Sequence, residues 1–445
     1  MPARSWRPGL RAAVLLIAAT VMASVGASVG ATQRFPGDQI FVTTALHKIH
    51  ITIAPSEWTV LQTSTPRGGT ASGALGGSQY RDDKGRLIHV GSGFGGYFPW
   101  ARADVKVVPA GAGDDESAGT ALQFKDAGIR YKGNSSFTSS SAAVPLHANF
   151  KLKFDVFGAN GKWDGEKTFN LHPGVIDTSK MREAIAYAVF RAAGVPAPRT
   201  TYAEVTFTVP GVIATSSAGL FTIIEDVNKT FLERVLPPGT GLLMKPEGLR
   251  GGVRSLGDAW SQYAPVLRPD RDATTHEQQR VMEFSKLVSQ TDVALFRSRI
   301  GDYLDVETFL RFIAVNAFLV NWDGYLRGGH NFYLYLDPAD DKFRFLPWDL
   351  DLSLGSRMGR GGETSDIMAP AGTDQPLIYW LLDDPAVAAR YKAIVRELGG
   401  TAFSAAHLTK LIDALEAVGS GRGPSPRAFL DTRAAYVRGL IAGWK

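Results

Sequence analysis

The 445-residue chain contains no cysteine, and this absence excludes three kinds of chemistry at once. Without cysteine there can be no disulfides, no thiolate zinc sites and no cysteine nucleophile. The stability of the fold must therefore come from a hydrophobic core. At 44% hydrophobic residues, a chain of this length has enough material for a large core.

The sequence also has little net charge. Its formal charge is +5, and three of the positive charges, Arg4, Arg7 and Arg11, precede residue 31, where there is no acidic residue. Subtracting these three leaves about +2 for the rest of the chain. Basic and acidic residues are interleaved without blocks of one sign, a pattern that argues against nucleic-acid binding.

Long hydrophobic runs are missing as well. The longest apolar stretch, residues 12–23, follows the three arginines and leads to small residues ending at Ala31, an order typical of a secretory signal peptide. An uncleaved anchor is the alternative, but the run is shorter than the ~20 residues that span a membrane. We therefore expect 1–31 to be a signal peptide, with a secreted or envelope protein of residues 32–445 and no stable membrane insertion.

Short alternating segments dominate the first half of the chain. Strands are predicted at 47–53, 104–108, 122–131, 149–157, 201–209 and 219–225, with a glycine-rich inserted loop at 68–96. One helix is predicted at 177–193, beginning with the capping residue Asp177 and ending at Gly194. Residues 45–225 should thus form a β-rich region with one helix.

Helical periodicity dominates from residue 277 onward and includes a helix at 305–320. Residues 248–275 are rich in Gly, Pro and Asp and are predicted to be a loop, whereas 375–445 should form amphipathic helices that pack on the core. Residues 226–445 are therefore expected to form a mainly helical region.

Two strands interrupt the helical half. Residues 331–336 and 342–349 are joined by a turn-rich segment at 337–341, which predicts a hairpin. Asn331 should lie across from about Asp349 at its open end, with Asp323 in the loop just before it.

These three residues suit phosphoryl transfer. The oxygens of Asn331 and Asp349 are ligands that Mg²⁺ accepts. Asp323 could orient and deprotonate an acceptor hydroxyl, which is the division of labour in kinases. A purely structural alternative stays open, in which Asp323 caps a turn, Asn331 satisfies backbone groups and Asp349 pairs with an arginine.

Cations for a nucleotide phosphate are available in the β-rich region. Lys151 and Lys153 alternate along one strand and share one face, although both could be solvated edge residues. Glu183 on the predicted helix could pair with one of them, as a kinase Lys–Glu pair requires, or face water.

Other candidate nucleotide contacts are weaker. Asn134 and Ser135 lie in a polar turn that could line a phosphate channel, but the sequence has no Walker lysine loop and no G-x-G-x-x-G. Glu225 ends an apolar strand where a hinge would contact adenine, and it could equally be an ordinary strand-end carboxylate.

Seven motifs in order along the chain resemble the CotH kinase family, named for spore coat protein H. They are Lys132-Gly-Asn-Ser-Ser136, Phe150-Lys-Leu-Lys-Phe154, Met181-Arg-Glu183, Gly219-Leu-Phe221 with Glu225, Asn321-Trp-Asp323, His330-Asn-Phe-Tyr-Leu-Tyr335 and Pro347-Trp-Asp-Leu-Asp351. The similarity runs from about His47 to Gly355 and covers most of the chain after residue 31.

This resemblance implies an α+β fold of the atypical protein-kinase type, bilobal, with a β-rich N-terminal lobe and a mainly helical C-terminal lobe. It also implies transfer of the γ-phosphate of ATP to serine residues of a protein substrate, with Mg²⁺ or Mn²⁺ as cofactor.

The resemblance assigns roles as well. Asp323 would be the catalytic aspartate, Asn331 and Asp349 would hold the metal, and Asp351 would be a secondary carboxylate near it. Lys153, or else Lys151, would contact the nucleotide, with Glu183 as its partner. One departure is Lys132, because the family pattern usually begins this turn with an arginine, which can pair bidentately.

Two competing interpretations remain. A non-catalytic surface or envelope binding protein (a pseudokinase) could use the same fold, since exported compartments offer little ATP. A secreted metal-dependent hydrolase would need histidine ligands or a second metal, and no ligand-spaced histidine pair falls on a predicted helix. His330 is expected to hydrogen-bond a neighbouring loop rather than bind a metal.

Overall fold

The computed structural model describes residues 34–64, 98–112, 120–133, 137, 145–158, 161–246, 252–355, 362–371, 375–419 and 423–444. Pro36–Lys445 forms one compact unit. The predicted signal peptide, the predicted inserted loop at 68–96, and both Asn134 and Ser135 lie outside the described residues.

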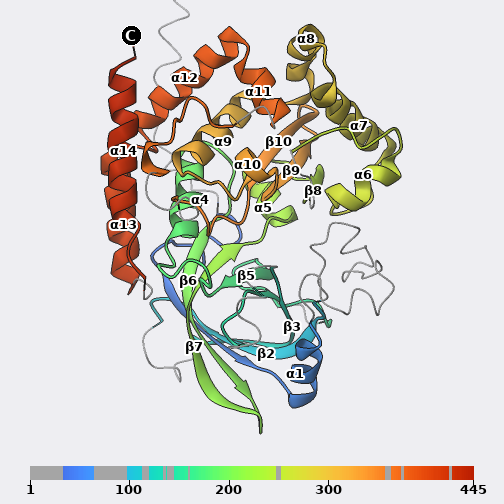
Figure 1. Cartoon of the computed structure of the whole chain (residues 1–445). Coiled ribbons are helices and arrows are strands. Elements are labelled where there is room, and N and C mark those ends of the chain that lie inside the picture. Colours follow the sequence, from blue (N-terminus) through green and yellow to red (C-terminus); the bar gives the residue numbers. More distant parts are fainter. Residues whose placement is uncertain are drawn as a thin grey trace, which may run out of the picture. The chain divides into compact units, whose positions relative to one another are not determined.

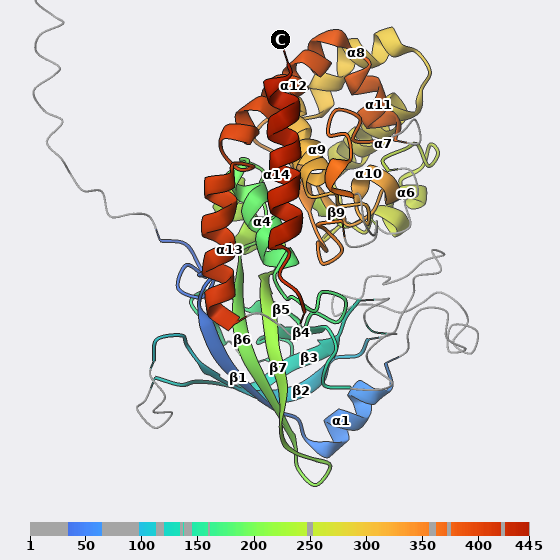
Figure 2. The same cartoon turned by 60° about the vertical axis from the view of Figure 1, so that its left-hand side comes forward.

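The first seven strands close into a barrel. Their order around it is β1-β2-β3-β4-β5-β7-β6, and β1 closes the barrel by pairing in parallel with β6, whereas the other neighbours are antiparallel (Figure 1; Figure 2 labels all seven strands). The strands are β1 (Leu46–Thr52), β2 (Ala101–Val108), β3 (Leu122–Tyr131), β4 (Phe150–Lys153), β5 (Thr168–His172), β6 (Thr200–Val209) and β7 (Ile213–Glu225). The predicted antiparallel sheet is present, but closure removes the exposed edges that the sequence suggested.

The barrel forms because its strands alternate. In β1 the residues at every second position are buried, including Ile49 and Ile51, and they join a separate hydrophobic cluster inside the barrel. A short helix, α1 (Pro55–Gln62), buries Trp58 and Leu61 in this cluster and was not predicted. The β-rich region therefore has two described helices rather than one.

The second of these helices, α4 (Arg182–Ala192), lies between β5 and β6 in the sequence and packs between the barrel and the helical half. It begins later than expected, and Asp177 binds the turn before it, accepting hydrogen bonds from the Ser179 and Arg182 amides at 3.1 and 2.8 Å. Its apolar residues belong to the helical core rather than to the barrel interior. The helix contacts β6 on one side and α9 (Val306–Phe318) on the other (Figure 2).

The second half of the chain is mainly helical, as expected. It comprises α5 (Lys229–Val235), β8 (Leu242–Met244), α6 (Trp260–Leu267), α7 (Thr275–Ser289), α8 (Val293–Tyr303), α9, α10 (Tyr325–Gly328), β9 (Phe332–Asp337), β10 (Lys342–Pro347), η1 (Gly362–Thr364), α11 (Pro376–Leu382), α12 (Pro385–Gly400), α13 (Ala405–Gly419) and α14 (Arg427–Ala442). Helix α6 falls in the segment predicted to be a loop. Among the helices that the structure describes, none is long and apolar enough to cross a membrane.

The predicted hairpin is confirmed as β9 and β10, which form a three-stranded sheet with β8. Its register pairs Pro347 with Phe332, so the residue opposite Asn331 is Trp348 rather than Asp349, one position from the expectation. The Trp348 amide donates to the Asn331 carbonyl at 3.2 Å. This register places Asn331 next to Asp349 at the open end of the hairpin.

Aromatic packing fixes the hairpin against α9. Phe345 on β10 lies 4.7 Å from Phe309 of α9 and 5.2 Å from Phe332 of β9, measured between ring centroids. Tyr325 of α10 packs edge-on against the same three rings. Such aromatic pairs each contribute about 0.5–1.5 kcal/mol beyond area burial, and together they hold the loop between α9 and β9.

A buried arginine secures the end of α9. Arg433 of α14 is 0% exposed, and its guanidinium donates to the carbonyls of Ala317 and Phe318 at 3.0 and 3.1 Å. It also donates to the carbonyls of Glu363 and Ser365 at 2.9 and 2.5 Å. Burial lowers its pKa to about 10, so the group remains charged. Four backbone acceptors thus depend on one side chain.

We expect Arg433→Met to destabilise the protein by roughly 3–5 kcal/mol, because it leaves buried carbonyls without donors. Arg438→Met, on an exposed position of the same helix, is the matched control and should change stability by less than about 0.5 kcal/mol. Urea unfolding of both variants measures the difference. Equal stability of the two variants would contradict an anchoring role for Arg433.

Candidate active site

The open end of the hairpin brings Asp323, Asn331 and Asp349 together. Asn331 donates from Nδ2 to the Asp323 carbonyl at 2.6 Å and approaches the Asp323 carboxylate at 3.4 Å. Asn331 and Asp349 both have left-handed backbones, with φ of 58° and 57°. The Asp349 amide donates to the Tyr187 hydroxyl of α4 at 3.2 Å. The hairpin, the loop after α9 and α4 therefore meet at one point.

The imidazole of His330 lies next to the carboxylate of Asp323. Its Nε2 lies 3.6 Å from Asp323 Oδ1, and this interaction raises the pKa of His330 above its ordinary value. The expectation that His330 contacts a neighbouring loop agrees with this geometry. The imidazole can thus support the negative charge of Asp323.

A second carboxylate, Asp351, lies close to Asp349. Burial, and then repulsion from Asp349 and Glu183, raise the pKa of Asp351 well above its usual range. Among the described residues, no side chain forms an ion pair or hydrogen bond with either carboxylate. Ionising both carboxyl groups costs free energy unless a cation neutralises them, and the raised pKa of Asp351 reflects that cost.

The donor set fits a hard divalent cation. Because Nδ2 of Asn331 binds Asp323, the amide oxygen is the atom left for a metal, and the Asp349 and Asp351 carboxylates supply further oxygens. Mg²⁺ usually takes one or two carboxylates and fills its other positions with water and phosphate. Within the described part of the chain, no group of three or more His, Asp or Glu side chains could hold a metal alone. The residues therefore fit an ion shared with a phosphate ligand.

The opposite side of the site is positively charged, and its central residue is Lys132, directly after β3. The Lys132 ammonium donates to Asn170 Oδ1 at 3.1 Å and to His172 Nε2 at 2.8 Å, and it lies 4.9 Å from the Trp348 ring centroid. Burial and then repulsion from Lys245 lower the pKa of Lys132 to about 7.

Glu183 binds a histidine rather than a lysine. Its Oε2 lies 2.8 Å from His172 Nδ1, and both side chains are nearly fully buried. The expected pair of Glu183 with Lys151 or Lys153 is therefore wrong. The physical reason is the barrel register, which places β5, and with it His172, next to β4.

The two strand lysines have other partners. Lys151 forms an ion pair with Asp226 at 2.9 Å, and Lys153 lies 3.7 Å from Asp155. Burial opposes ionisation of Asp226, but the charge of Lys151 and its hydrogen bond lower the pKa of that carboxyl to about 2. Asn170 also donates to Asp226 at 3.0 Å, which connects Lys151 to the Lys132 side of the site.

Sequence reasoning missed His172, Asn170 and Lys245. Asn170 and His172 are two residues apart in β5, a strand that is buried throughout, so they share a face with Thr168, opposite to Phe169 and Leu171. Two polar residues at that spacing were the available signal. Lys245 follows β8 and lies 5.5 Å from the Trp348 ring centroid, and its sequence gave no such signal.

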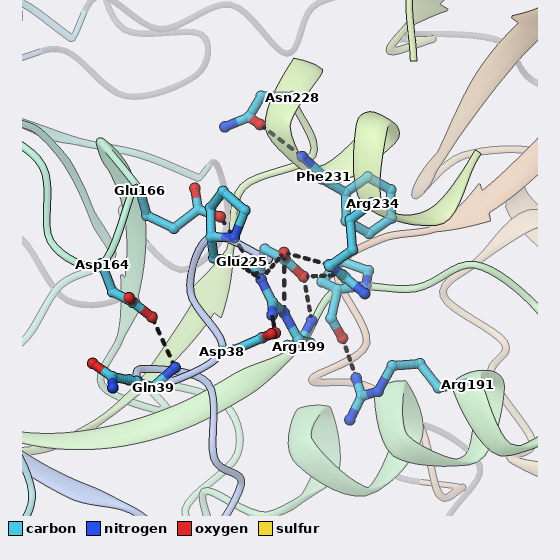
Figure 3. Close-up of polar contacts among 12 residues, drawn as sticks. Asp38, Gln39, Asp164, Glu166, Arg191, Arg199, Glu225, Asn228, Phe231 and Arg234 are labelled. Atoms are coloured by element: carbon cyan, nitrogen blue, oxygen red, sulfur yellow. Dashed lines mark hydrogen bonds and ion pairs between the residues drawn. The ribbon is translucent and has the colours of Figure 1, made fainter. Parts of the chain in front are cut away.

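Glu225 does not have the adenine-facing role considered for it. Figure 3 shows its carboxylate held between Arg199 and Arg234. It accepts from the Arg199 amide at 2.9 Å, from the Arg199 guanidinium at 2.6 and 3.1 Å, and from Arg234 at 2.6 and 3.3 Å. With 1% exposure, both oxygens are committed to these arginines. Glu225 therefore anchors the end of β7.

Glu166 lies beside this network (Figure 3). It is 2% exposed, and its Oε1 accepts no hydrogen bond from any described residue, the Arg199 guanidinium being 3.7 Å away. Burial and then the charge of Glu225 raise its pKa from 4.5 to about 7. The folded protein therefore holds this proton more tightly than the unfolded chain does.

Because the pKa of Glu166 is raised on folding, its protonated carboxyl contributes fully to the stability of the fold below pH 4.5. This contribution to the free energy of unfolding is lost as the pH rises through about 7. We expect Glu166→Gln, which cannot ionise, to gain up to about 3 kcal/mol relative to wild type between pH 5 and pH 8. Urea unfolding across this range measures the difference. A stability difference that stays constant with pH would contradict the raised pKa.

Comparisons with known proteins agree with the motifs. The family model described as CotH kinase protein matches residues 129–420. Invasin CotH7 of Rhizopus delemar is 26% identical over 253 residues, which cover 52% of this chain and 40% of the relative. Inner spore coat protein H of Bacillus subtilis is 21% identical over 253 residues, covering 56% of this chain and 67% of that protein.

Among solved structures, the Helicobacter pylori proinflammatory kinase CtkA aligns with 70% of this chain and 95% of its own, at 9% identity and a TM-score of 0.27, too low to establish a shared fold. The family match is broader evidence, because it extends from β3 to the end of α13 and includes Asp323, Asn331 and Asp349. The resemblance seen in the motifs is confirmed: this chain belongs to the CotH kinase family, whose members are kinase-like proteins.

Proposed function

We propose that this protein transfers the γ-phosphate of ATP to serine residues of a protein substrate in a metal-dependent reaction. The observation that carries the proposal is the meeting of Asp323, Asn331 and Asp349 opposite a group of lysines. Phosphoryl transfer depends mainly on positioning and charge stabilisation, and this arrangement offers both.

Asp323 is proposed to orient the acceptor hydroxyl and to accept its proton. Its place in the loop after α9 is secured by Asn331, and His330 lies against its carboxylate. A group that both orients and accepts a proton typically contributes a factor of about 10²–10⁴ to the rate.

Asn331, Asp349 and Asp351 are proposed to hold Mg²⁺ or Mn²⁺. A metal ion held there would supply positive charge that offsets the charge of the phosphate oxygens. The mutual repulsion of Asp349 and Asp351 supports this role, because two carboxylates without a described ionic partner favour a bound cation.

Lys132 and Lys151 are proposed to face the nucleotide phosphates. Both lie on the outer face that β3, β4 and β5 share, as the register of Lys151 with Asn170 shows. Lys153 is two residues further along the same face, beside Asp155. On this proposal the barrel and the helical half correspond to the two lobes of a kinase, with the nucleotide between them.

The protein is also proposed to act outside the cytoplasm, on the basis of the signal-like segment at 1–31. The names of the relatives, an invasin and a spore coat protein, support a second candidate, a surface binding protein without catalysis. The cluster of ionisable groups favours the kinase, because a binding surface would gain nothing from partly buried carboxylates that repel one another.

The test is phosphate incorporation from labelled ATP into serine-rich peptides, with Mg²⁺ or Mn²⁺. We expect Asp323→Asn to lower kcat at least 100-fold while metal-dependent ATP binding is kept, because Asp323 acts on the acceptor. Asp349→Asn should abolish both, since it removes a metal ligand. Excess EDTA should stop incorporation in the wild type.

Asp302→Asn is the matched control, because Asp302 is a partly exposed carboxylate paired with Arg299 on α8. Its activity should equal that of the wild type. If the wild type incorporates no label and ATP with metal leaves its melting temperature unchanged, the binding-protein interpretation stands and the proposed roles of Asp323 and Asp349 fall.

A further inference from the structure

The partly buried Lys132 and the buried His172 and Glu183 form a continuous chain from the barrel to α4. Lys132 Nζ lies 2.8 Å from His172 Nε2, and His172 Nδ1 lies 2.8 Å from Glu183 Oε2. Both His172 and Glu183 are 4% exposed. A kinase-type pair would join the lysine directly to the helix glutamate, whereas here an imidazole stands between them.

The chemistry of the partners fixes the proton on the imidazole. When Lys132 is protonated, as it must be to bind a phosphate as a cation, its ammonium group only donates, so Nε2 of His172 accepts from it. The single proton of the neutral ring is then on Nδ1, opposite Glu183 Oε2, and it is donated to the carboxylate when Glu183 is ionised. Burial and then the charge of Asp349 raise the pKa of Glu183 well above its usual range, whereas the charge of Lys132 lowers it. Burial and the charge of Lys132 lower the pKa of His172 well below its ordinary value, which agrees with a neutral ring.

Besides His172, the Lys132 ammonium contacts Asn170 and the ring of Trp348. Asn170 presents Oδ1 to the ammonium at 3.1 Å, and its amide nitrogen is held by Asp226 at 3.0 Å. The face of Trp348, directly before Asp349 in the sequence, lies 4.9 Å away. The ammonium is therefore held beside the predicted metal ligand Asp349.

The helix that carries Glu183 also carries Tyr187, one turn later on α4. Since Tyr187 accepts the Asp349 amide at 3.2 Å, α4 positions the lysine and the aspartate together. Glu183 forms no hydrogen bond with Lys132. Its charge raises the pKa of Lys132, and its hydrogen-bonded connection to Lys132 runs through His172.

We propose that Glu183 is a positioning residue that acts through His172, fixing its tautomer so that Lys132 is aimed at a phosphate group. The proposal rests on the proposed function in one respect, the phosphate ligand. Its logic is that of a carboxylate holding a histidine in one tautomer beside a catalytic group.

The experiment compares the affinity for ATP with metal against the affinity for adenosine, by isothermal titration. Glu183→Gln removes the negative charge and offers Nδ1 a donor, which favours the tautomer that sets an N–H against the ammonium. We expect ATP affinity to fall about tenfold while adenosine affinity stays within about twofold. A merely structural defect would weaken both ligands equally.

A double-mutant cycle links the effect to Lys132. Lys132→Met should lower ATP affinity as much as Glu183→Gln, and the combined variant should be no worse than Lys132→Met alone, because both act on the same contact. Additive losses would overturn the proposal. Glu166→Gln, an equally buried carboxyl outside the chain of three, is the control and should keep the wild-type ratio of the two affinities.

An NMR measurement and a second variant test the proposal independently of Glu183→Gln. Imidazole ¹⁵N shifts should show a proton on Nδ1 of His172 in the wild type, and a proton on Nε2 would overturn the proposal without any ligand. Should Glu183→Gln fail to fold, His172→Asn must show the same selective loss of ATP affinity. A wild type that binds ATP no better than adenosine would overturn the proposed function itself. If the wild type prefers ATP and Glu183→Gln leaves the ratio of the two affinities unchanged, only the proposed role of Glu183 is overturned.

Discussion

The hydrogen bond from the Asp349 amide to the Tyr187 hydroxyl decides where the two sides of the site meet. Asp349 has a left-handed backbone, which costs an L-residue about 1–2 kcal/mol, and one hydrogen bond contributes about as much. Glu183, one turn earlier on α4, reaches back to the barrel through His172. If α4 shifted along its axis, the carboxylates and the lysine would move apart, so its packing against α9 and β6 fixes their distance.

The charges of the molecule fall into two groups that differ in how they are compensated. Glu225 receives five hydrogen bonds from two arginines and is satisfied as it stands. Asp351 and Asp349 have no described ionic partner, although both lie in a partly enclosed site. A protein relieves such repulsion by raising a carboxyl pKa, as at Asp351, or by binding a cation. The carboxylates without an arginine partner, rather than the paired one, therefore mark the proposed active site.

The sequence was sufficient for the hairpin and for the residues at its open end, because local alternation and a turn determine both. Asp323 could be placed for the same reason, as it precedes the hairpin by a few residues. The partner of Glu183 could not be predicted, since it depends on which strand lies beside β4 in a closed barrel. The partners of Glu225 could not be predicted for a related reason. Its two arginines come from the start of β6 and from α5, and no local sequence pattern connects them to Glu225.

The arginine pair on Glu225 also explains how the barrel is tied to the helical half. Arg199 binds Asp38 and the Pro36 carbonyl at 2.7 Å each, so the segment before β1, the start of β6 and the end of β7 share one guanidinium. Arg234 extends the same network into α5, the first helix after the barrel. Removing either arginine would leave the buried carboxylate of Glu225 with an uncompensated charge, so the link between the barrel and α5 depends on both.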